Sequence, residues 1–239
     1  MGVVLNARQR VREAVIADIV AEARRQLAIQ GAAALSLRAV ARELGMASSA
    51  MYRYVASRDE LLTALIVEGY DALGGVAEAA AASGGPAWQR WRAVCRAIRE
   101  WALEHPHEYA LLYGSPVPDY QAPGSTVGPA SRVTLVLAGV LLDAHRAREL
   151  VSRGEPALSA AMAVEAERVA LGALPGVPLP TVARAVVAWA QLFGQISFEL
   201  FGRFHGVIAD TEVLFDHAVA VMADQLGIKP PPVTASRGG

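Results

Sequence analysis

Residues 35–62 read LSLRAVARELGMASSAMYRYVASRDELL, and the spacing of their apolar side chains predicts short helices. Leu37, Val40 and Leu44 recur at the spacing of a single helical face. Ser36 stands directly before them and is a favourable N-cap residue, because its hydroxyl can accept a hydrogen bond from a free backbone N–H of the first turn. The first part of the stretch therefore predicts a short helix that begins after Ser36.

A glycine and two serines then mark a turn and another short helix. Gly45 can adopt the positive φ that a tight turn requires, and Ser48 or Ser49 can cap a helix that runs through Val55. Two helices joined in this way form a helix-turn-helix, whose second helix can enter the DNA major groove by its N-terminal end. Many small α domains contain a two-helix corner, so the corner alone is weak evidence of DNA binding.

Longer helices are expected on both sides of this corner. The apolar residues of the segment 8–30 lie on one stripe of a helix. Ser57 and Glu60 predict a capping box, in which each side chain satisfies the other's backbone N–H, at the start of a long fourth helix. Gly74 and Gly75 are candidate positions for the end of that helix or for a kink.

The remaining sequence predicts an all-α fold, because alternating strand patterns are nearly absent. Further helices are expected over residues 88–104, 106–113, 131–152, 156–174, 181–204 and 210–226. The segment 114–129 is longer than most connections, and it predicts either an ordered functional lid or a mobile segment.

Basic residues are concentrated near the N-terminus. The net charge is -1, but residues 1–58 hold nine arginines and four acidic residues, a balance of +5 that leaves -6 for the remainder. A basic segment on an acidic body suits a polyanionic partner held at one end. The alternative is that a GC-rich coding sequence raises the arginine content, which accounts for the preference for Arg over Lys but not for the segregation of charge.

Several classes of protein are disfavoured. The single cysteine, Cys95, rules out an intrachain disulfide and a multi-cysteine metal cluster. The longest stretches without a charge are shorter than the roughly 20 residues that a bilayer span needs. The N-terminal segment lacks the unbroken apolar run of a signal peptide. We therefore expect a cytoplasmic, globular protein without a transmembrane helix.

The hypothesis of an enzyme depends on His105, His107 and Glu108, which could suggest a metal site. Pro106 places them at a helix start, where residues i and i+2 diverge, and no set of partner ligands is identifiable. Neither a Ser-His-Asp, nor a Walker, nor a dinucleotide motif is found, so we expect no catalytic residue, no metal and no cofactor. An α-helical scaffold or lipid carrier remains an alternative, but it leaves the basic segment unexplained.

The opening stretch resembles the signature of the TetR family of transcriptional regulators. It has a serine before the second helix, a glycine turn, a Tyr-x-x-Val end to the third helix and Ser-Arg-Asp-Glu-Leu-Leu at the fourth. The resemblance is strong from about Arg10 to Tyr70 and looser in LLYGSPVPDYQAP and WAQLFGQISFELFGRFHGV. These two stretches resemble the ligand-domain subgroup named for a Trp-His-Gly motif, represented here by Trp189, Gly202, His205 and Gly206.

The resemblance implies a set of DNA contacts. It implies phosphate contacts for Ser36, Tyr54 and Arg58, and groove or backbone contacts for Arg38, Ser48, Ser49, Tyr52 and Arg53. The chemistry agrees, because arginine can bond guanine bidentately and tyrosine can bond a phosphate while it packs on a sugar. The alternatives are a core position for Tyr54 and a solvated surface charge for Arg53.

The resemblance also implies a homodimer that binds a palindromic operator of double-stranded DNA, as a repressor. The segment 181–204 is too apolar for a surface helix, and with 213–226 it suggests a four-helix dimer interface, the alternative being a buried core helix. The expected interface residues are Trp189, Phe193, Ile196, Leu200, Val213 and Met222.

A small effector is expected to release the operator. Because the body is apolar, this effector should be hydrophobic or amphipathic. The candidate effector-binding residues are Trp88, Trp91, Trp101, Tyr109, Tyr113, Tyr120 and Phe198, although aromatic residues at helical spacing are more often plain core. The expected domains are a DNA-binding domain at 1–56, an effector-binding and dimerisation domain at 57–228 and a disordered tail at 229–239.

Overall fold

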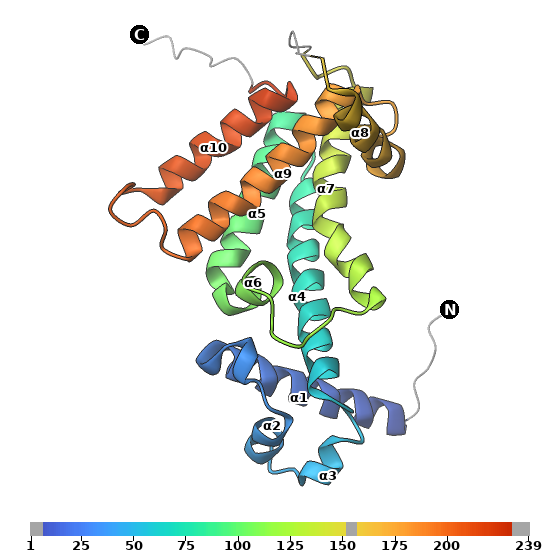
Figure 1. Cartoon of the computed structure of the whole chain (residues 1–239), viewed down its shortest axis with the longest axis vertical. Coiled ribbons are helices and arrows are strands. Elements are labelled where there is room, and N and C mark those ends of the chain that lie inside the picture. Colours follow the sequence, from blue (N-terminus) through green and yellow to red (C-terminus); the bar gives the residue numbers. More distant parts are fainter. Residues whose placement is uncertain (1–6, 152–156, 231–239) are drawn as a thin grey trace. The chain divides into compact units, whose positions relative to one another are not determined.

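The computed structural model describes residues 7–151 and 157–230, and these form ten α-helices, two short 3-10 helices and no strand (Figure 1). The all-α prediction is confirmed. The chain divides into two compact units, the first made of residues 1–72 with 105–130 and the second of residues 73–104 with 131–239. The helices α4 (Arg58–Ala81) and α7 (Val127–Arg146) each contribute residues to both units. The predicted tail lies outside the described residues from position 231 onward.

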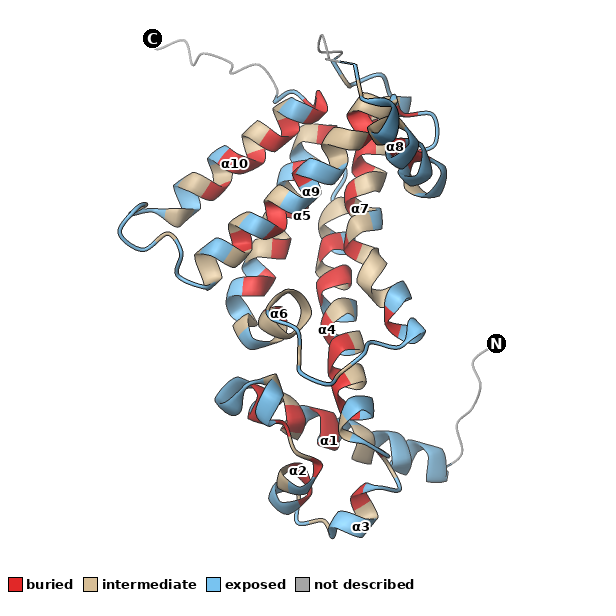
Figure 2. Cartoon of the chain, viewed as in Figure 1, coloured by how far each residue is buried: buried red, intermediate tan, exposed pale blue. Residues whose placement is uncertain are grey.

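The first unit is a cluster of mostly short helices around the long α1. Its elements besides part of α4 are α1 (Ala7–Gln30), η1 (Ala32–Ala34), α2 (Leu37–Glu43), α3 (Ser48–Met51), α6 (Pro106–Tyr113) and η2 (Gly124–Thr126). Ile19 and Ala23 of α1 are fully buried, as are Val40 of α2 and Met51 of α3 (Figure 2). One apolar stripe of α1 thus holds the helix-turn-helix in place.

The second unit is a bundle of longer helices. Its elements besides parts of α4 and α7 are α5 (Ala87–Glu104), α8 (Ala160–Ala173), α9 (Leu179–Leu200) and α10 (Thr211–Leu226). The helix α9 packs along both α8 and α10. Trp91 of α5 is buried, and its indole N–H donates to the carbonyl of Val219 in α10 at 3.2 Å, which fixes the ring between the two helices.

The start of α4 confirms the predicted capping box, with one shift in register. The amide of Glu60 donates to the Ser57 hydroxyl at 3.1 Å, while the Glu60 carboxylate accepts from the amide of Ala56 at 2.6 Å, one residue earlier than expected. One of the two bonds of a capping box is therefore found as predicted, and the helix begins where the sequence predicts.

Gly74 and Gly75 neither end nor kink α4, which continues to Ala81. A Cβ added at Gly74 would stand 2.9 Å from the Cβ of Arg132 on α7, closer than real side chains approach. Arg132 is held there by Glu78, one turn further along α4, with Nη2 to Oε2 at 2.7 Å. Gly74 is therefore a place of close contact between α4 and α7.

The segment 114–129 belongs to the first unit and contacts the buried cluster of that unit at two positions. Val117 and Tyr120 pack on the buried cluster of that unit, and the Tyr120 hydroxyl lies 3.0 Å from the Thr63 hydroxyl. The α7 helix starts at Val127, earlier than expected, because Pro129 is tolerated in a first turn. This segment thus packs on the core of the first unit through Val117 and Tyr120.

Candidate nucleic-acid interface

The corner between α2 and α3 has the geometry that its sequence predicts. Gly45 has a φ of +64°, and the amide of Met46 donates to the carbonyl of Ala41 at 2.8 Å, which closes the turn after α2. Only glycine adopts this φ without strain. The buried Leu37, Val40 and Met51 face α1 and leave the opposite side of the corner to solvent.

The N-terminus of α3 is placed one residue earlier than predicted. Its N-cap is Ala47, whose backbone is extended and whose carbonyl accepts from the amide of Met51 at 3.2 Å. Ser48 and Ser49 therefore lie in the first turn and do not cap the helix, so neither hydroxyl is used to satisfy a backbone amide. The helix ends at Met51, and turns follow it to Tyr54.

Five of the predicted DNA-contacting residues are exposed on this corner, which we call the reading surface: Arg38, Ser48, Ser49, Tyr52 and Arg53. Tyr52 keeps half of its surface exposed although it is a large aromatic residue. In the part of the chain that the structure describes, none of these five side chains has a hydrogen bond or ion pair with the protein. These five polar groups are thus free to contact base edges and phosphates.

The other three predicted contacts are less accessible. Ser36 is half-buried, and its hydroxyl makes no capping bond although it occupies the N-cap position of α2. Tyr54 is half-buried against the core of the first unit. The guanidinium of Arg58 donates to the carbonyls of Ala32 at 3.0 Å and Leu35 at 3.2 Å. Arg58 thereby fixes the connection between α1 and α2, a role that sequence reasoning missed.

An ion-pair cluster joins three helices of the first unit. Arg24 of α1 bonds Glu68 of α4, Nη2 to Oε2 at 2.5 Å, and lies 3.4 Å from Glu108 of α6. Glu108 follows the two histidines of the hypothetical metal site, of which His105 is the N-cap residue of α6 and His107 is exposed. Among the described residues, no three His, Cys, Asp or Glu side chains gather to hold a metal ion.

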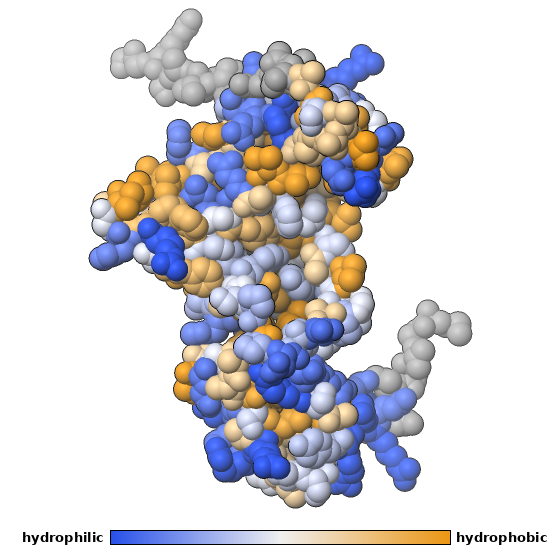
Figure 3. Space-filling view, in the orientation of Figure 1, coloured by the Kyte–Doolittle hydropathy of each residue, from blue (hydrophilic) through white to orange (hydrophobic). Residues whose placement is uncertain are grey.

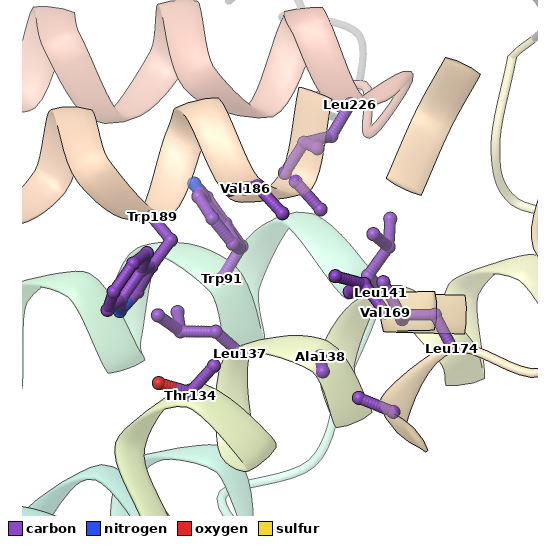
Figure 4. Close-up of a pocket in the computed structure, with 12 residues that line it drawn as sticks. Trp91, Thr134, Leu137, Ala138, Leu141, Val169, Leu174, Val186, Trp189 and Leu226 are labelled. Carbon is purple, nitrogen blue, oxygen red and sulfur yellow. The ribbon is translucent and has the colours of Figure 1, made fainter. Parts of the chain in front are cut away.

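The second unit contains an apolar cavity of about 70 Å³ (Figure 4). Its walls come from five helices and from the residue that follows α8: Trp91, Thr134, Leu137, Ala138, Leu141, Val169, Ala173, Leu174, Ala185, Val186, Trp189 and Leu226. The Thr134 hydroxyl is the main polar group among these side chains. Val186 and Trp189 keep 38% and 39% of their surfaces exposed, so they form its rim.

Comparison with known proteins identifies the architecture. A family model described as bacterial regulatory proteins, tetR family, matches residues 19–65, and a Tetracyclin repressor-like C-terminal domain model matches residues 91–222. The chain is also 41% identical over 234 residues to the HTH-type transcriptional regulators Rv1816 of Mycobacterium tuberculosis and Mb1846 of Mycobacterium bovis, covering 91% of this chain and 96% of each relative. The chain belongs to the TetR family.

Solved structures agree with this TetR membership. A crystal structure of SCO4313, described as a regulatory protein, has a TM-score of 0.77 at 33% identity, covering 92% of this chain and all of that one. A Rhodococcus protein of unknown function shares the fold, with a TM-score of 0.68 at 22% identity, covering 89% of this chain and 95% of that one. The family membership makes this protein a DNA-binding transcriptional regulator. The Trp-His-Gly subgroup stays a prediction.

The residues predicted to bind an effector in this TetR protein are distributed over both units. Trp91 alone among them lines the cavity. Tyr109 and Tyr113 pack on each other in the first unit with ring centroids 5.1 Å apart, and Tyr120 supports the same unit. Trp101 is core and Trp88 is half-buried, both away from the cavity lining, while Phe198 is 54% exposed. The cavity itself is lined mainly by aliphatic residues.

The predicted dimer interface also needs correction. Ile196 and Met222 are fully buried within their own chain, and Phe193 keeps only 8% exposure, so these three belong to the core. Leu200 is half-buried, whereas Trp189 and Val213 are exposed. The outward side of α9 is a different apolar stripe, the exposed α9 face, made of Val187, Ala190, Gly194 and Phe198. Figure 3 shows hydrophobic residues gathered over α9 and the turns after it.

Charged groups hold α5 against α9 and α10 in the second unit. Arg99 bonds Glu199, Nη2 to Oε1 at 2.6 Å, and Glu199 also accepts from the Thr211 hydroxyl at 2.7 Å. Burial alone would raise the pKa of Glu199, but the bonds from Arg99 and Thr211 outweigh it and lower this pKa below its ordinary value. Arg96 bonds Asp216, and this bond lowers the pKa of that carboxyl against the effect of burial.

Among the residues that the structure describes, one helical segment, Gly124–Arg146, is long and apolar enough to cross a membrane, by length and composition only. It contains α7, whose Val133, Leu137 and Leu141 are buried in the protein. A single helix of this kind is weak evidence of a membrane span.

Proposed function

We propose that this regulator binds a palindromic operator as a homodimer, acts as a repressor in the cytoplasm, and is released from DNA by a small hydrophobic effector. The observation that carries the DNA-binding part is the reading surface, five uncommitted polar side chains around a helix-turn-helix. We propose that Ser36, Tyr54 and Arg58 flank it, Arg58 by positioning the start of α2. We also propose that the DNA-binding domain ends at residue 56 and that the effector-binding and dimerisation domain begins at residue 57.

The test is selection of bound sequences from random duplexes, beside a double variant, Arg38→Ala with Tyr52→Ala. We expect an enriched palindrome with the parent protein, because two reading heads related by a two-fold axis contact two half-sites. The double variant should lose the enrichment while its circular dichroism and thermal unfolding stay unchanged, since both side chains are exposed. If the parent enriches no motif, the alternative of a small-molecule-binding scaffold gains support.

The exposed α9 face supports the homodimer. Val187 and Phe198 keep 60% and 54% of their surfaces exposed, and Gly194 between them allows a second helix to approach closely. We expect a Val187→Glu, Phe198→Glu variant to sediment as a monomer and to lose its operator affinity. Leu171 of α8 is 80% exposed, so Leu171→Glu is the matched control that should remain dimeric.

The cavity supports an uncharged effector. A charge placed among its apolar walls would lose its hydration without a partner, whereas the Thr134 hydroxyl can orient a neutral polar group. We expect an Ala138→Phe variant, which fills the cavity, to bind operator but to resist release by small uncharged probes such as indole or toluene in a gel-shift assay. Ala161→Phe on the exposed side of α8 is the control. Equal release from both variants would contradict this site.

A further inference from the structure

The first unit has a second basic feature beside the reading surface, which we call the arginine depression. It is open, has a volume of about 490 Å³ and is lined by Ala7, Arg8, Val11, Arg12, Arg53 and Tyr54. Arg8, Val11 and Arg12 lie on one face of the first two turns of α1, at the i, i+3 and i+4 spacing. Arg53 and Tyr54 come from the turns directly after α3.

The three arginines of the depression have no protein partner among the residues that the structure describes. Neither a hydrogen bond nor an ion pair of their side chains is found there, and none of the lining residues is acidic. Further along the same helix, by contrast, Arg25 bonds Glu22 through two nitrogens, both at 2.8 Å. The unpaired arginines of α1 are thus gathered at the end that faces α3.

Three guanidinium groups beside one depression repel one another unless an anion lies between them. Planar guanidinium groups bind phosphate through paired N–H donors, and they lose less solvation than an ammonium group does. Val11 is 63% exposed and Tyr54 is half-buried, so the depression also offers apolar walls against which a sugar can pack. The residue set fits a sugar-phosphate backbone better than a free inorganic ion.

We propose that the arginine depression binds a phosphate of the DNA backbone outside the bases that α3 contacts. This rests on the proposed DNA-binding function. Arg53 belongs both to the depression and to the reading surface, so one strand can pass from α3 to the start of α1. Such a phosphate bond carries no sequence information, but it fixes the register of the corner on the duplex.

The test is the salt dependence of DNA binding by the full chain, measured with a random-sequence duplex and with the selected palindrome. We expect an Arg8→Ala, Arg12→Ala variant to lower the slope of log K against log salt by about 0.9 for each phosphate that is no longer neutralised, which weakens binding about eightfold per phosphate at about 0.1 M salt. The enriched sequence itself should not change. The corresponding double lysine variant should retain most of the slope, because it keeps both charges.

Arg25→Ala is the control, since it also removes an arginine charge from α1, one instead of two, but from a residue already bonded to Glu22. A slope as large in the Arg8→Ala, Arg12→Ala variant as in Arg25→Ala would overturn the proposal, provided that the parent protein binds DNA. A parent without DNA binding would instead overturn the proposed function. Competition by inorganic phosphate at constant ionic strength, with an unchanged DNA slope in the variant, would show a free-anion site and would also overturn it.

Discussion

Tyrosine and tryptophan are divided between the two units without overlap. The six tyrosines, Tyr52, Tyr54, Tyr70, Tyr109, Tyr113 and Tyr120, belong to the first unit, and the four tryptophans, Trp88, Trp91, Trp101 and Trp189, belong to the second. In the first unit Tyr52 is exposed on the reading surface and the Tyr120 hydroxyl lies 3.0 Å from that of Thr63, whereas in the second unit Trp91 and Trp101 are buried among apolar residues. The two units therefore solve different problems, a polar contact surface in one and an apolar interior in the other.

The largest expected effect on the free energy of unfolding comes from truncating one buried methionine in the core of each unit. Met51 in the first unit and Met222 in the second are both fully buried. Met51→Ala and Met222→Ala should each lower the free energy of unfolding by about 2–5 kcal/mol, through reduced burial and the cavity left behind. Only Met51→Ala should also weaken operator binding, because Met51 anchors α3. Equal loss of operator binding in both variants, measured by gel shift, would mean that a destabilised second unit impairs DNA binding as much as a destabilised first unit does.

A smaller effect should separate the ion pairs of the two units. Arg99 and Glu199 in the second unit keep only 13% and 9% of their side-chain surfaces exposed, against 42% and 46% for Arg24 and Glu68 in the first. Arg99→Ala should cost about 1–3 kcal/mol, because it leaves a largely buried carboxylate with only the Thr211 hydroxyl as a partner. Arg24→Ala should cost no more than about 1 kcal/mol. Urea unfolding of both variants measures the difference, and similar values would contradict it.

Two neighbouring glycines of α4 should respond in opposite ways to substitution by alanine, although both lie in the second unit. Gly74→Ala should destabilise by about 1–3 kcal/mol, since its Cβ would clash with Arg132. Gly75 has nothing within 4 Å of an added Cβ, so Gly75→Ala should stabilise by about 0.5–1 kcal/mol through helix propensity. Thermal unfolding should show opposite signs. A gain in stability at both positions would mean that Arg132 moves away without cost.

The smallest effect concerns acid. The pKa values of Glu199 and Asp216 are lower in the folded chain than their ordinary values of 4.5 and 3.8. The stability that these carboxylates contribute is therefore complete above those values and is lost as the pH falls through the lower, folded-state values. The melting temperature should drop below about pH 4. A Glu199→Gln, Asp216→Asn variant should show a shallower drop, and an identical one would exclude these groups as the cause.

How far the sequence alone predicts this protein depends on the distance between interacting residues. The turn at Gly45, the capping box at Ser57 and the helix limits of α6 follow from neighbours in the chain, and all three are found in the structure. The role of Arg58 was missed because its partners lie more than 20 residues earlier. The sequence around Arg58 does not indicate its hydrogen bonds to the carbonyls of Ala32 and Leu35.

The second unit was harder to predict for the same reason. The periodicity of α9 indicates that it is apolar all round but not which side faces its own chain, so Ile196 was assigned to the interface although it is core. The cavity requires five helices from positions between 91 and 226 to leave a gap, and no local pattern encodes a gap. Aliphatic residues that line it, such as Leu137, look like core residues in sequence.

The division of aromatic residues also gives each unit its own optical label. Light absorbed by tryptophan alone excites only the second unit, and two of its four tryptophans, Trp91 and Trp189, line the cavity. Their emission therefore responds to what enters the cavity. Excitation of tyrosine reports on the first unit in addition. The intact, unlabelled protein thus distinguishes a signal at one unit from a signal at the other.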